Sequence, residues 1–556
     1  MSKYIFITGG VLSSVGKGIA MASIGKLLQV RGFTITSIKI DPYLNYDSGT
    51  MNPYMHGEVY VTEDGSEADL DLGHYERFLD INLSRDHNIT TGQVYSAVID
   101  KERKGDYLGQ CVQIIPHITD EIKNRIRKVA ERSKVDIVFV EVGGTVGDIE
   151  SLPFLEAIRH LRLEEGYVNT LFVHVGLIPH LDVTGEFKTK PIQHSIQELR
   201  RIGIQPDIIV ARSREPLSGE PRKKIALFGS VEERAVFCSP NLRSIYEVPL
   251  ILDEQGMGDF ISERLSLPKR KPDWAEWYQI VKTFLDAQNE VKIAICGKYA
   301  KLADSYVSIN EALRHAGAAC GTRVLIEWME TEAFEEDPTK IETLREYDGI
   351  LVPGGFGTRA TEGKINAINY ARTHNIPFLG ICFGFQLATV EFARNVCGFK
   401  DANSTEINPE TRHPVIDFLP EQKGVEYKGA TMRLGAYPVS IKPGTLAHKL
   451  YKADTIYERH RHRYEVNPDY WDILQKNGLL YSGCTPDGKR MEVLEIPNNF
   501  FFFATQFHPE FKSRPGRPDP AYFGFIKSAL DKQLGKSKIE LSEEKIQYAA
   551  ISSNRA

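Results

Sequence analysis

The sequence lacks the features that mark exported or membrane-spanning proteins. Its seven cysteines include no C-x-x-C pair, which argues against a disulfide framework and against a structural zinc site. It contains no stretch of about 18 consecutive apolar residues, and its start, MSKYIFITGG, does not resemble a signal peptide. We therefore expect a cytoplasmic protein with reduced thiols and no membrane partner.

The chain also lacks the excess of basic residues that nucleic-acid binding requires. Its formal net charge is −6 over 556 residues, so any phosphate binding must be local, and we expect no nucleic-acid partner. The one basic run, ERHRHRYEVN at residues 458–467, is better explained by pairing within the chain. With 42% hydrophobic and 26% charged residues, the composition is that of an ordinary globular protein.

Changes of pattern divide the chain, which is too long for one hydrophobic core. Short β-branched runs alternate with amphipathic stretches up to about residue 260, and this alternation is typical of βαβ units. A Pro- and charge-rich stretch then precedes a second α/β series that begins with KIAICG. We predict an α/β protein with two doubly wound domains at residues 1–265 and 291–534, a linker helix within 266–290 and a mobile polar tail at 535–556.

A glycine-rich turn, GGVLSSVGKG at residues 9–18, joins the first predicted strand to a helix. Backbone N–H groups at such a helix N-terminus bind phosphate oxygens, and Lys17 can reach the terminal phosphates. Five residues instead of the usual four separate Gly10 from Gly16, and Gly18 replaces the hydroxyl residue that usually binds magnesium. The turn predicts a nucleoside-triphosphate site of modified form.

A metal ion at this site would need oxygen ligands from elsewhere in the chain, and carboxylates are the expected ones. Glu141 closes the apolar strand VDIVFVEV, at the edge where open α/β sheets bind ligands. Asp71 lies in the acidic segment EADLDLGHYERF, which we predict to be a loop, and a solvated loop carboxylate is the alternative for it. We expect Asp71 and Glu141 to bind Mg²⁺.

Two further segments gather charged residues, TVGDIE at 145–150 and GEFKTKPIQ at 185–193. In the second, Lys188 and Lys190 precede a predicted helix whose first turn suits Pro191. Lysines at a helix start oppose the helix dipole unless an anionic ligand binds there. Taken alone, each segment is equally consistent with a solvated turn.

A cysteine flanked by two glycines follows another apolar strand, in IPFLGICFGFQ. The G-x-C-x-G pattern around Cys382 is that of a nucleophile elbow, and the helix N-terminus after it favours a thiolate. His508 and Glu510 can serve as the base and its orienting partner, since residues two apart project to one side of an extended backbone. The turn PGGFG at 353–357 and the N–H of Phe383 can bind an oxyanion. An inert buried cysteine is the alternative, but three matched elements favour a catalytic one.

These segments together resemble the CTP synthase family, from Tyr4 to about Phe525. Among the most specific stretches are IKIDPYLN, DLDLGHYERF, VGGTVGDIESLPFLEA, GEFKTKP, DANSTE, ERHRHRYEVN and QFHPEF. The resemblance implies a P-loop, dethiobiotin-synthetase-like synthase domain followed by a class I glutamine amidotransferase domain. It implies that ATP phosphorylates the 4-oxygen of UTP and that ammonia from glutamine, passed through a channel between the domains, displaces the phosphate. This reaction is the final step of de novo CTP synthesis.

The resemblance also implies roles for residues at matching positions. The catalytic residues would be Lys17, Cys382, His508 and Glu510, and the metal ligands Asp71 and Glu141. ATP would contact Ser14, Val15, Gly16, Lys17, Gly18, Ile19 and Asp71. UTP or CTP would contact Ser13, Asp148, Ile149, Glu150, Lys188, Thr189, Lys190, Pro191, Ile192, Gln193 and Lys224. Glutamine would contact Gly355, Phe383, Gly384, Phe385, Gln386, Glu406 and Arg463.

Further implications concern partners and regulation: Mg²⁺, CTP as feedback inhibitor, GTP as activator, a homotetramer, and filaments. The sequence departs from the family pattern where Phe383 and Phe385 replace Leu and Met of the elbow, and where Ile192 replaces a Thr. Two rival functions are a catalytically silent assembly protein and another ammonia-transferring ligase, such as a cobyrinic acid diamide synthase. The intact Lys17 and Cys382 argue against the first, and GEFKTKP and GDIE against the second.

Overall fold

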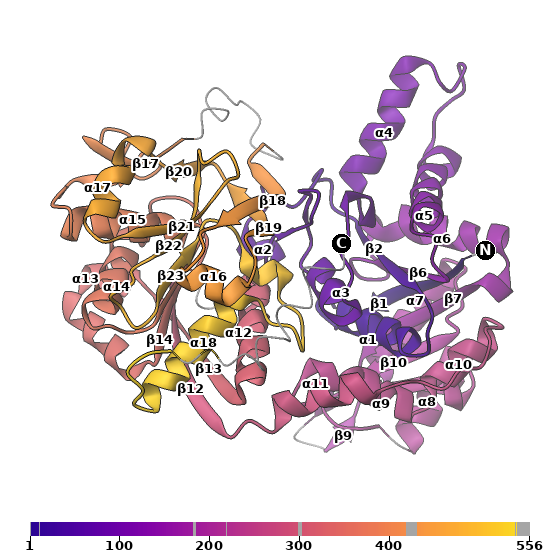
Figure 1. Ribbon diagram of the computed structural model, residues 1–556. Coiled ribbons are helices and arrows are strands. Elements are labelled where there is room, and N and C mark those ends of the chain that lie inside the picture. Colours follow the sequence, from indigo (N-terminus) through magenta and orange to yellow (C-terminus); the bar gives the residue numbers. More distant parts are fainter. Residues whose placement is uncertain are drawn as a thin grey trace. The chain divides into compact units, whose positions relative to one another are not determined.

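The structure is a computed structural model that describes residues 2–10, 12–181, 185–217, 219–298, 303–418, 431–539 and 541. The chain forms two compact units (Figure 1). Unit 1 comprises Met1–Ser48 and Ala68–Val281, and unit 2 comprises Gly49–Glu67 and Lys282–Ala556. Most of the predicted tail at 535–556 lies outside the described residues. No helix in the described ranges is long and apolar enough to span a membrane.

Unit 1 is built on a seven-stranded sheet whose paired strands all run parallel. Parallel neighbours need crossover connections, and helices provide them, so the α/β prediction is confirmed for this unit. In spatial order the strands are β11 (Val236–Ser239), β10 (Ile208–Arg212), β7 (Thr170–Leu177), β1 (Lys3–Gly10), β6 (Ile137–Val142), β2 (Ile35–Asp41) and β5 (Asn88–Thr90).

Helices cover the faces of this sheet, as Figure 1 shows. One face carries a core in which Phe6 and Val140 of the sheet pack with Val98, Ile126 and Phe154 of three helices. These strands are buried along nearly their whole length, which explains the apolar runs of β1 and β6, whereas β2 also buries the charged residues Lys39 and Asp41. The helices of unit 1 are α1 (Lys17–Gln29), α3 (Asp71–Leu79), α4 (Thr91–Lys104), α5 (Thr119–Ser133), α6 (Leu152–Glu165), α7 (Lys190–Arg201), α8 (Glu220–Gly229), α9 (Val248–Glu254) and α10 (Met257–Arg264).

Unit 2 contains a nine-stranded mixed sheet. Its first five strands are parallel, as predicted for a doubly wound domain, whereas the other four are antiparallel and were not foreseen from the sequence. In spatial order the strands are β13 (Thr322–Glu330), β12 (Asn289–Gly297), β14 (Gly349–Val352), β15 (Phe378–Ile381), β23 (Phe502–Thr505), β22 (Met491–Glu495), β21 (Leu480–Cys484), β18 (Arg433–Ile441) and β19 (Thr455–His462).

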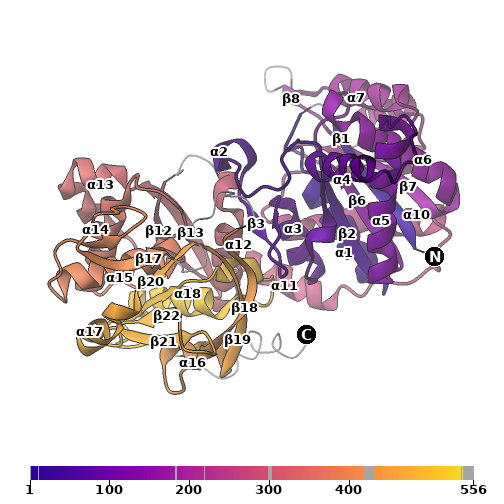
Figure 2. The ribbon, with the colours of Figure 1, turned by 90° about the horizontal axis from the view of Figure 1, so that it is seen from above.

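Two hydrophobic cores lie on opposite faces of this sheet. One packs α14 (Thr361–Thr373) and α15 (Phe383–Asn395) against the strands, and the other packs α12 (Val307–Cys320) and α18 (Pro520–Gln533) (Figure 2). The remaining helices are α2 (Pro53–His56), α11 (Ala275–Leu285), α13 (Glu332–Glu336), α16 (Leu446–Tyr451) and α17 (Trp471–Lys476). The strands outside the two large sheets are β3 (Tyr60–Val61), β4 (Glu67–Ala68), β8 (His180–Leu181), β9 (Glu186–Phe187), β16 (Ala402–Ser404), β17 (His413–Phe418) and β20 (Tyr464–Val466).

Residues 49–67 pack within unit 2, although we assigned them to the first domain from the sequence. The Arg459 guanidinium pairs with Glu63 at 3.0 Å, and that of Arg461 pairs with Glu67 at 2.7 Å. Because both arginines come from the run ERHRHRYEVN, the expectation that this run pairs within the chain is confirmed. The two acidic residues were not recognisable as partners because hundreds of residues separate them from the arginines.

Candidate functional site

The glycine-rich turn lies between β1 and α1, where the sequence analysis predicted it. Gly16 caps α1 with a φ of 91°, a left-handed conformation that glycine adopts without strain. Lys17 begins the helix, and its ammonium donates a hydrogen bond of 2.7 Å to the carbonyl oxygen of Gly144. Burial lowers the pKa of Lys17, and nearby Glu141 opposes that shift. The turn therefore presents helix N–H groups and one lysine together, as a phosphate site requires.

Gly18 has a structural role that the sequence did not reveal. A Cβ on this residue would overlap the carboxylate of Asp71, since Oδ1 lies well inside contact distance of it. Asp71 is the first residue of α3 and not part of a loop, so our loop prediction for it was wrong. The absence of a side chain at Gly18 thus admits a carboxylate where a Ser or Thr hydroxyl would otherwise be.

Four carboxylates surround the Lys39 ammonium. Glu141 lies opposite Lys39 in the register of β6 and β2, and its Oε1 is 3.3 Å from Nζ. Nζ is also 3.4 Å from Asp69 Oδ1 and 3.7 Å from Asp41 Oδ1, and it pairs with Asp71. The sequence analysis missed Lys39, Asp41 and Asp69 as members of one cluster, because the cluster depends on the pairing of β2 with β6 and on the packing of the segment before α3 against β2.

The charges in this cluster depend on one another. Burial and the neighbouring Asp71 raise the pKa of Glu141 to about 7, while Lys39 opposes the shift. Burial would also raise the pKa of Asp71, but the Lys39 ammonium holds it well below its usual range. Tyr75 donates a hydrogen bond to Glu141 and fixes its orientation. An ionised Asp71 beside Glu141 offers the hard oxygen ligands that suit Mg²⁺.

The residues present fit a Mg²⁺ ion that takes only some of its ligands from the protein and the others from a bound phosphate and water. Among the described residues, no group of three or more His, Cys, Asp or Glu side chains is arranged as a complete metal cage. Mg²⁺ commonly binds one or two carboxylates and takes its other ligands from phosphate oxygens and water. Asp71 and Glu141, next to the phosphate turn, fit this arrangement.

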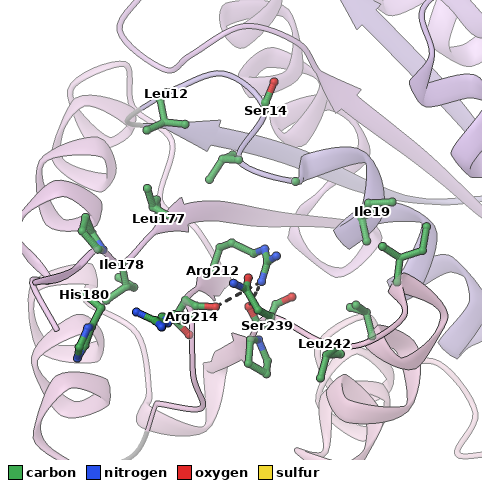
Figure 3. Close-up of a pocket in the computed structure, with 18 of the residues that line it drawn as sticks. Leu12, Ser14, Ile19, Leu177, Ile178, His180, Arg212, Arg214, Ser239 and Leu242 are labelled. Carbon is green, nitrogen blue, oxygen red and sulfur yellow. Dashed lines mark hydrogen bonds between the residues drawn. The ribbon is translucent and has the colours of Figure 1, made fainter. Parts of the chain in front are cut away.

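A pocket of about 690 Å³ opens beside the turn, as Figure 3 shows. It lies at the carboxyl ends of β7, β10 and β11, where parallel sheets bind ligands. Arg212 forms part of its wall and is fixed by a 2.9 Å hydrogen bond to the Ser239 carbonyl oxygen. The sequence analysis predicted the turn residues of this pocket, such as Ser14 and Ile19, but missed its wall at the ends of the three strands, including Arg212. Other lining residues include Leu12, Ser14, Ile19, Leu177, His180, Arg214, Asn241 and Leu242.

The remaining nucleotide candidates of unit 1 lie in different surroundings. Asp148, Ile149 and Glu150 are exposed in a short turn before α6, and Ile149 is 80% exposed. Lys188 pairs with Glu186 at 2.6 Å, and Lys224 pairs with Glu220 at 2.6 Å. Both lysines are exposed enough to exchange these partners for a phosphate.

Ile192 differs from its neighbours in α7. Its side chain is fully buried in a core with Ile196 and Ile209, and it occupies the space beside Gly176 that a Cβ there would need. A hydroxyl at this position would therefore face the core, so the replacement of Thr by Ile removes no group from an open site.

In unit 2, Cys382 forms the turn between β15 and α15. Its φ of 51° and ψ of −97° are strained for a residue with a side chain. A Cβ on Gly384 would overlap the Val352 carbonyl oxygen, and a Cβ on Gly380 would lie 3.0 Å from the Ala504 Cβ. Both flanking glycines are therefore required by close packing, as the elbow motif predicts.

His508 and Glu510 lie beside Cys382. Nδ1 of His508 is 2.7 Å from Oε1 of Glu510, although the chain turns into a 3₁₀ helix at Pro509 and is not extended as we had assumed. Burial lowers the pKa of His508, but Glu510 and Cys382 outweigh it and raise that pKa to about 10. An imidazolium held in this way stabilises a neighbouring thiolate.

The turn at residues 353–357 adjoins these side chains. A Cβ on Gly354 would lie 2.8 Å from His508 Cε1 and 3.6 Å from Cys382 Cβ, so only glycine allows the backbone to approach so closely. The Gly357 N–H donates a 2.7 Å hydrogen bond to Glu406. Lys298, which the sequence analysis missed, donates to the Phe356 carbonyl oxygen and holds the turn from the other side. The glycine turn and the first residue of α15, Phe383, therefore both adjoin the thiol.

Of the other predicted glutamine contacts, Gln386 is linked to Cys382 through Gln506, whereas Arg463 contacts another segment. Gln386 donates a 2.9 Å hydrogen bond to the Tyr464 carbonyl oxygen and one of 3.2 Å to Gln506, whose own amide lies 3.7 Å from the Cys382 sulfur. The guanidinium of Arg463 donates to the Thr431 hydroxyl at 2.9 Å. The sequence analysis missed Gln506, although it is part of the QFHPE segment.

Comparisons with known proteins cover both units. The family model described as CTP synthase N-terminus matches residues 3–267, and that of class I glutamine amidotransferase matches residues 301–528. A CTP synthase of Pyrococcus abyssi is 60% identical over 96% of this chain and 98% of its own length. One from Methanocaldococcus jannaschii is 56% identical over 96% and 99%. The solved glutaminase domain of Trypanosoma brucei CTPS with bound acivicin is 40% identical, with a TM-score of 0.41, and covers 43% of this chain and 94% of its own.

Proposed function

Because this chain belongs to the CTP synthase family, we propose that its units perform the two halves of one ligase reaction, the amination of UTP to CTP with nitrogen from glutamine. The observation that carries the proposal is the presence of two sites in one chain. Unit 1 has a phosphate turn with Lys17, and unit 2 has Cys382 on an elbow beside the His508–Glu510 pair. Neither site alone would turn glutamine nitrogen into a nucleotide amine.

In unit 1, ATP would bind with its phosphates on residues 14–19 and its base in the pocket walled by Arg212. Mg²⁺, held by Asp71 and Glu141, would supply charge neutralisation for phosphoryl transfer. Lys17 would stabilise the charge that develops on the transferred phosphoryl group. UTP would use Ser13, residues 188–191, Gln193 and Lys224 for its triphosphate and base, while the buried Ile192 side chain would stay in the core. Transfer to the 4-oxygen of UTP makes that oxygen a good leaving group.

In unit 2, the Cys382 thiolate would attack the side-chain amide of glutamine, which Glu406 and Arg463 help to orient. N–H groups of Gly355 and Phe383 would bind the oxyanion of the tetrahedral intermediate. His508, oriented by Glu510, would protonate the amide nitrogen as its bond to carbon breaks, so that ammonia leaves, and would then activate the water that hydrolyses the thioester to release glutamate. Ammonia would add to C4 of the phosphorylated UTP, and inorganic phosphate would leave.

Gly18 provides a test of how the metal is held. Because a Cβ here would overlap Asp71, we expect Gly18→Ala and Gly18→Ser to lose Mg²⁺-dependent ATP binding equally, by about a hundredfold. Calorimetric titration of ATP with and without Mg²⁺ measures the effect. If Gly18→Ser bound ATP much more tightly than Gly18→Ala, a hydroxyl would be an acceptable ligand there and the assignment of Asp71 would be wrong.

Feedback by CTP is a further part of the proposal. CTP and UTP share a triphosphate, so discrimination must come from the sugar and base, and Glu150 is an exposed acceptor in the segment assigned to CTP. We expect Glu150→Lys to weaken CTP inhibition by about tenfold while changing the KM for UTP less than twofold or so. The N-cap of α6 is Ser151 and not Glu150, so we expect stability to change little. If the ratio of the CTP inhibition constant to the KM for UTP did not change, a product-sensing role of Glu150 would be excluded.

We also propose a cytoplasmic homotetramer that is activated by GTP and can assemble into filaments. Support for assembly comes from apolar side chains exposed on α4 and the segment after it, which extends from the sheet of unit 1 (Figure 1). Leu108 is 91% exposed, and Ile99, Ile114 and Ile115 are each about half exposed. A partner subunit would remove this apolar surface from water.

The direct test of the function is to incubate the protein with UTP, ATP, Mg²⁺, glutamine and GTP and to measure CTP by chromatography. We expect CTP to form only when UTP, ATP, Mg²⁺ and a nitrogen source, either glutamine or an ammonium salt, are present together. Failure to form CTP with either glutamine or an ammonium salt would refute the proposed function.

A further inference from the structure

Lys364 is a buried lysine next to the amidotransferase site. It lies in the first turn of α14 and is only 1% exposed, among apolar residues of the core that contains Val352, Ile365 and Phe385. No ion pair of its ammonium with a carboxylate is found among the described residues, and the neighbouring Glu335 carboxylate accepts a hydrogen bond from the Gly363 N–H instead. Burying an unpaired charge is costly, so such a residue needs another explanation.

The partner of the Lys364 ammonium is the ring of Phe383. Nζ lies 5.2 Å from the ring centroid, within the range of a cation–π interaction. Phe383 immediately follows Cys382 and begins α15, and its own side chain is 1% exposed. Its ring also lies next to the glycine turn at residues 353–357, because a Cβ on Gly355 would lie 4.0 Å from Phe383 Cδ1. The ring is thus held between a buried ammonium and the glycine turn.

The charges around Lys364 fit this position. Burial and the Lys298 ammonium lower the pKa of Lys364 to about 7, and Arg359 acts in the same direction. The Cys296 thiol and Glu335 act in the opposite direction, and Lys364 in turn lowers the pKa of Glu406, which burial raises. Lys298 donates to the Phe356 carbonyl oxygen and Lys364 lies on the Phe383 ring, so two basic groups adjoin the turn and the elbow where negative charge develops during glutamine hydrolysis.

We propose that Lys364 is a positioning residue for glutamine hydrolysis: its ammonium on the Phe383 ring fixes the residue whose backbone N–H binds the oxyanion. This inference rests on the proposed glutaminase function of Cys382. Because the oxyanion exists only in the transition state and intermediate, the interaction acts on kcat and not on glutamine binding.

The test compares Lys364→Met, which keeps the length and removes the charge, with Lys400→Met, which removes an exposed lysine of the same unit. We expect Lys364→Met to lower kcat for glutamine hydrolysis about tenfold with nearly unchanged KM, and Lys400→Met to lower neither. Because Lys364→Met removes a buried charge, its thermal unfolding midpoint should stay the same or rise. If Lys364→Met had a lower thermal unfolding midpoint but the same kcat per folded molecule as the wild type, the proposal would be overturned and Lys364 would have only a structural role.

Phe383→Leu removes the aromatic ring and supplies a second route if Lys364→Met folds poorly. We expect Phe383→Leu alone to lower kcat to a similar extent. Adding Lys364→Met to Phe383→Leu should lower kcat further by less than about twofold. If Lys364→Met lowered kcat equally in the wild type and in Phe383→Leu, the proposed interaction between Lys364 and Phe383 would be contradicted. Wild-type protein that fails to hydrolyse glutamine would refute the proposed function itself, whereas an active wild type with an equally active Lys364→Met would refute only this inference.

Discussion

Replacement of Cys382 by Ala should abolish CTP synthesis from glutamine and leave synthesis from ammonium salts largely intact. The thiol is the only nucleophile assigned to ammonia release, so we expect the glutamine-dependent rate to fall by about a thousandfold or more. The ammonia-dependent rate should stay within about twofold of the wild-type value, because phosphoryl transfer and attack on C4 use groups of unit 1. Parallel assays with the two nitrogen sources on one preparation measure both rates.

Cys397→Ala is the matched control, because Cys397 is a partly buried free thiol of the same unit that follows α15. It should change neither rate. Loss of both activities in Cys382→Ala, with a normal thermal unfolding midpoint, would contradict the division of labour between the two sites.

Replacement of Lys17 by Ala should remove CTP synthesis with either nitrogen source. Lys17 is the buried cation at the start of α1, and both routes need the phosphorylated UTP intermediate whose formation it promotes. We expect a loss of about a thousandfold in each case, since charge stabilisation of phosphoryl transfer is lost. Rates of ADP release and CTP formation should fall together.

Lys269→Ala serves as a control, since Lys269 is an exposed lysine at the end of unit 1. Its rates should match those of the wild type. Retention of ammonia-dependent synthesis in Lys17→Ala would show that the glycine-rich turn is not the ATP site.

The local motifs of the two sites could be predicted from the sequence because each depends on neighbouring residues. The turn that ends in Lys17 and the elbow around Cys382 are set by glycines within a few positions, and glycine is needed there for backbone conformation or close packing. The strands that lead into both turns were also recognisable as apolar runs.

Contacts between distant segments could not be predicted in the same way. Lys39 faces Glu141 only because β2 and β6 are neighbours, and the sequence does not state which strands pair. The pocket beside Arg212 depends on three strand ends, and residues 49–67 join unit 2 through ion pairs such as Arg459–Glu63. Gly18 shows the same limit, since the missing hydroxyl was evident but the carboxylate that lies against it was not.

The central claim is that nitrogen released at Cys382 becomes the 4-amino group of CTP. Incubation of the wild-type protein with UTP, ATP, Mg²⁺ and glutamine labelled with heavy nitrogen in its side-chain amide tests this claim directly, with mass spectrometry of the purified nucleotide. We expect CTP one mass unit heavier than the unlabelled product, formed together with equal amounts of ADP, phosphate and glutamate. Unlabelled CTP, or labelled ammonia released without any CTP, would contradict the account.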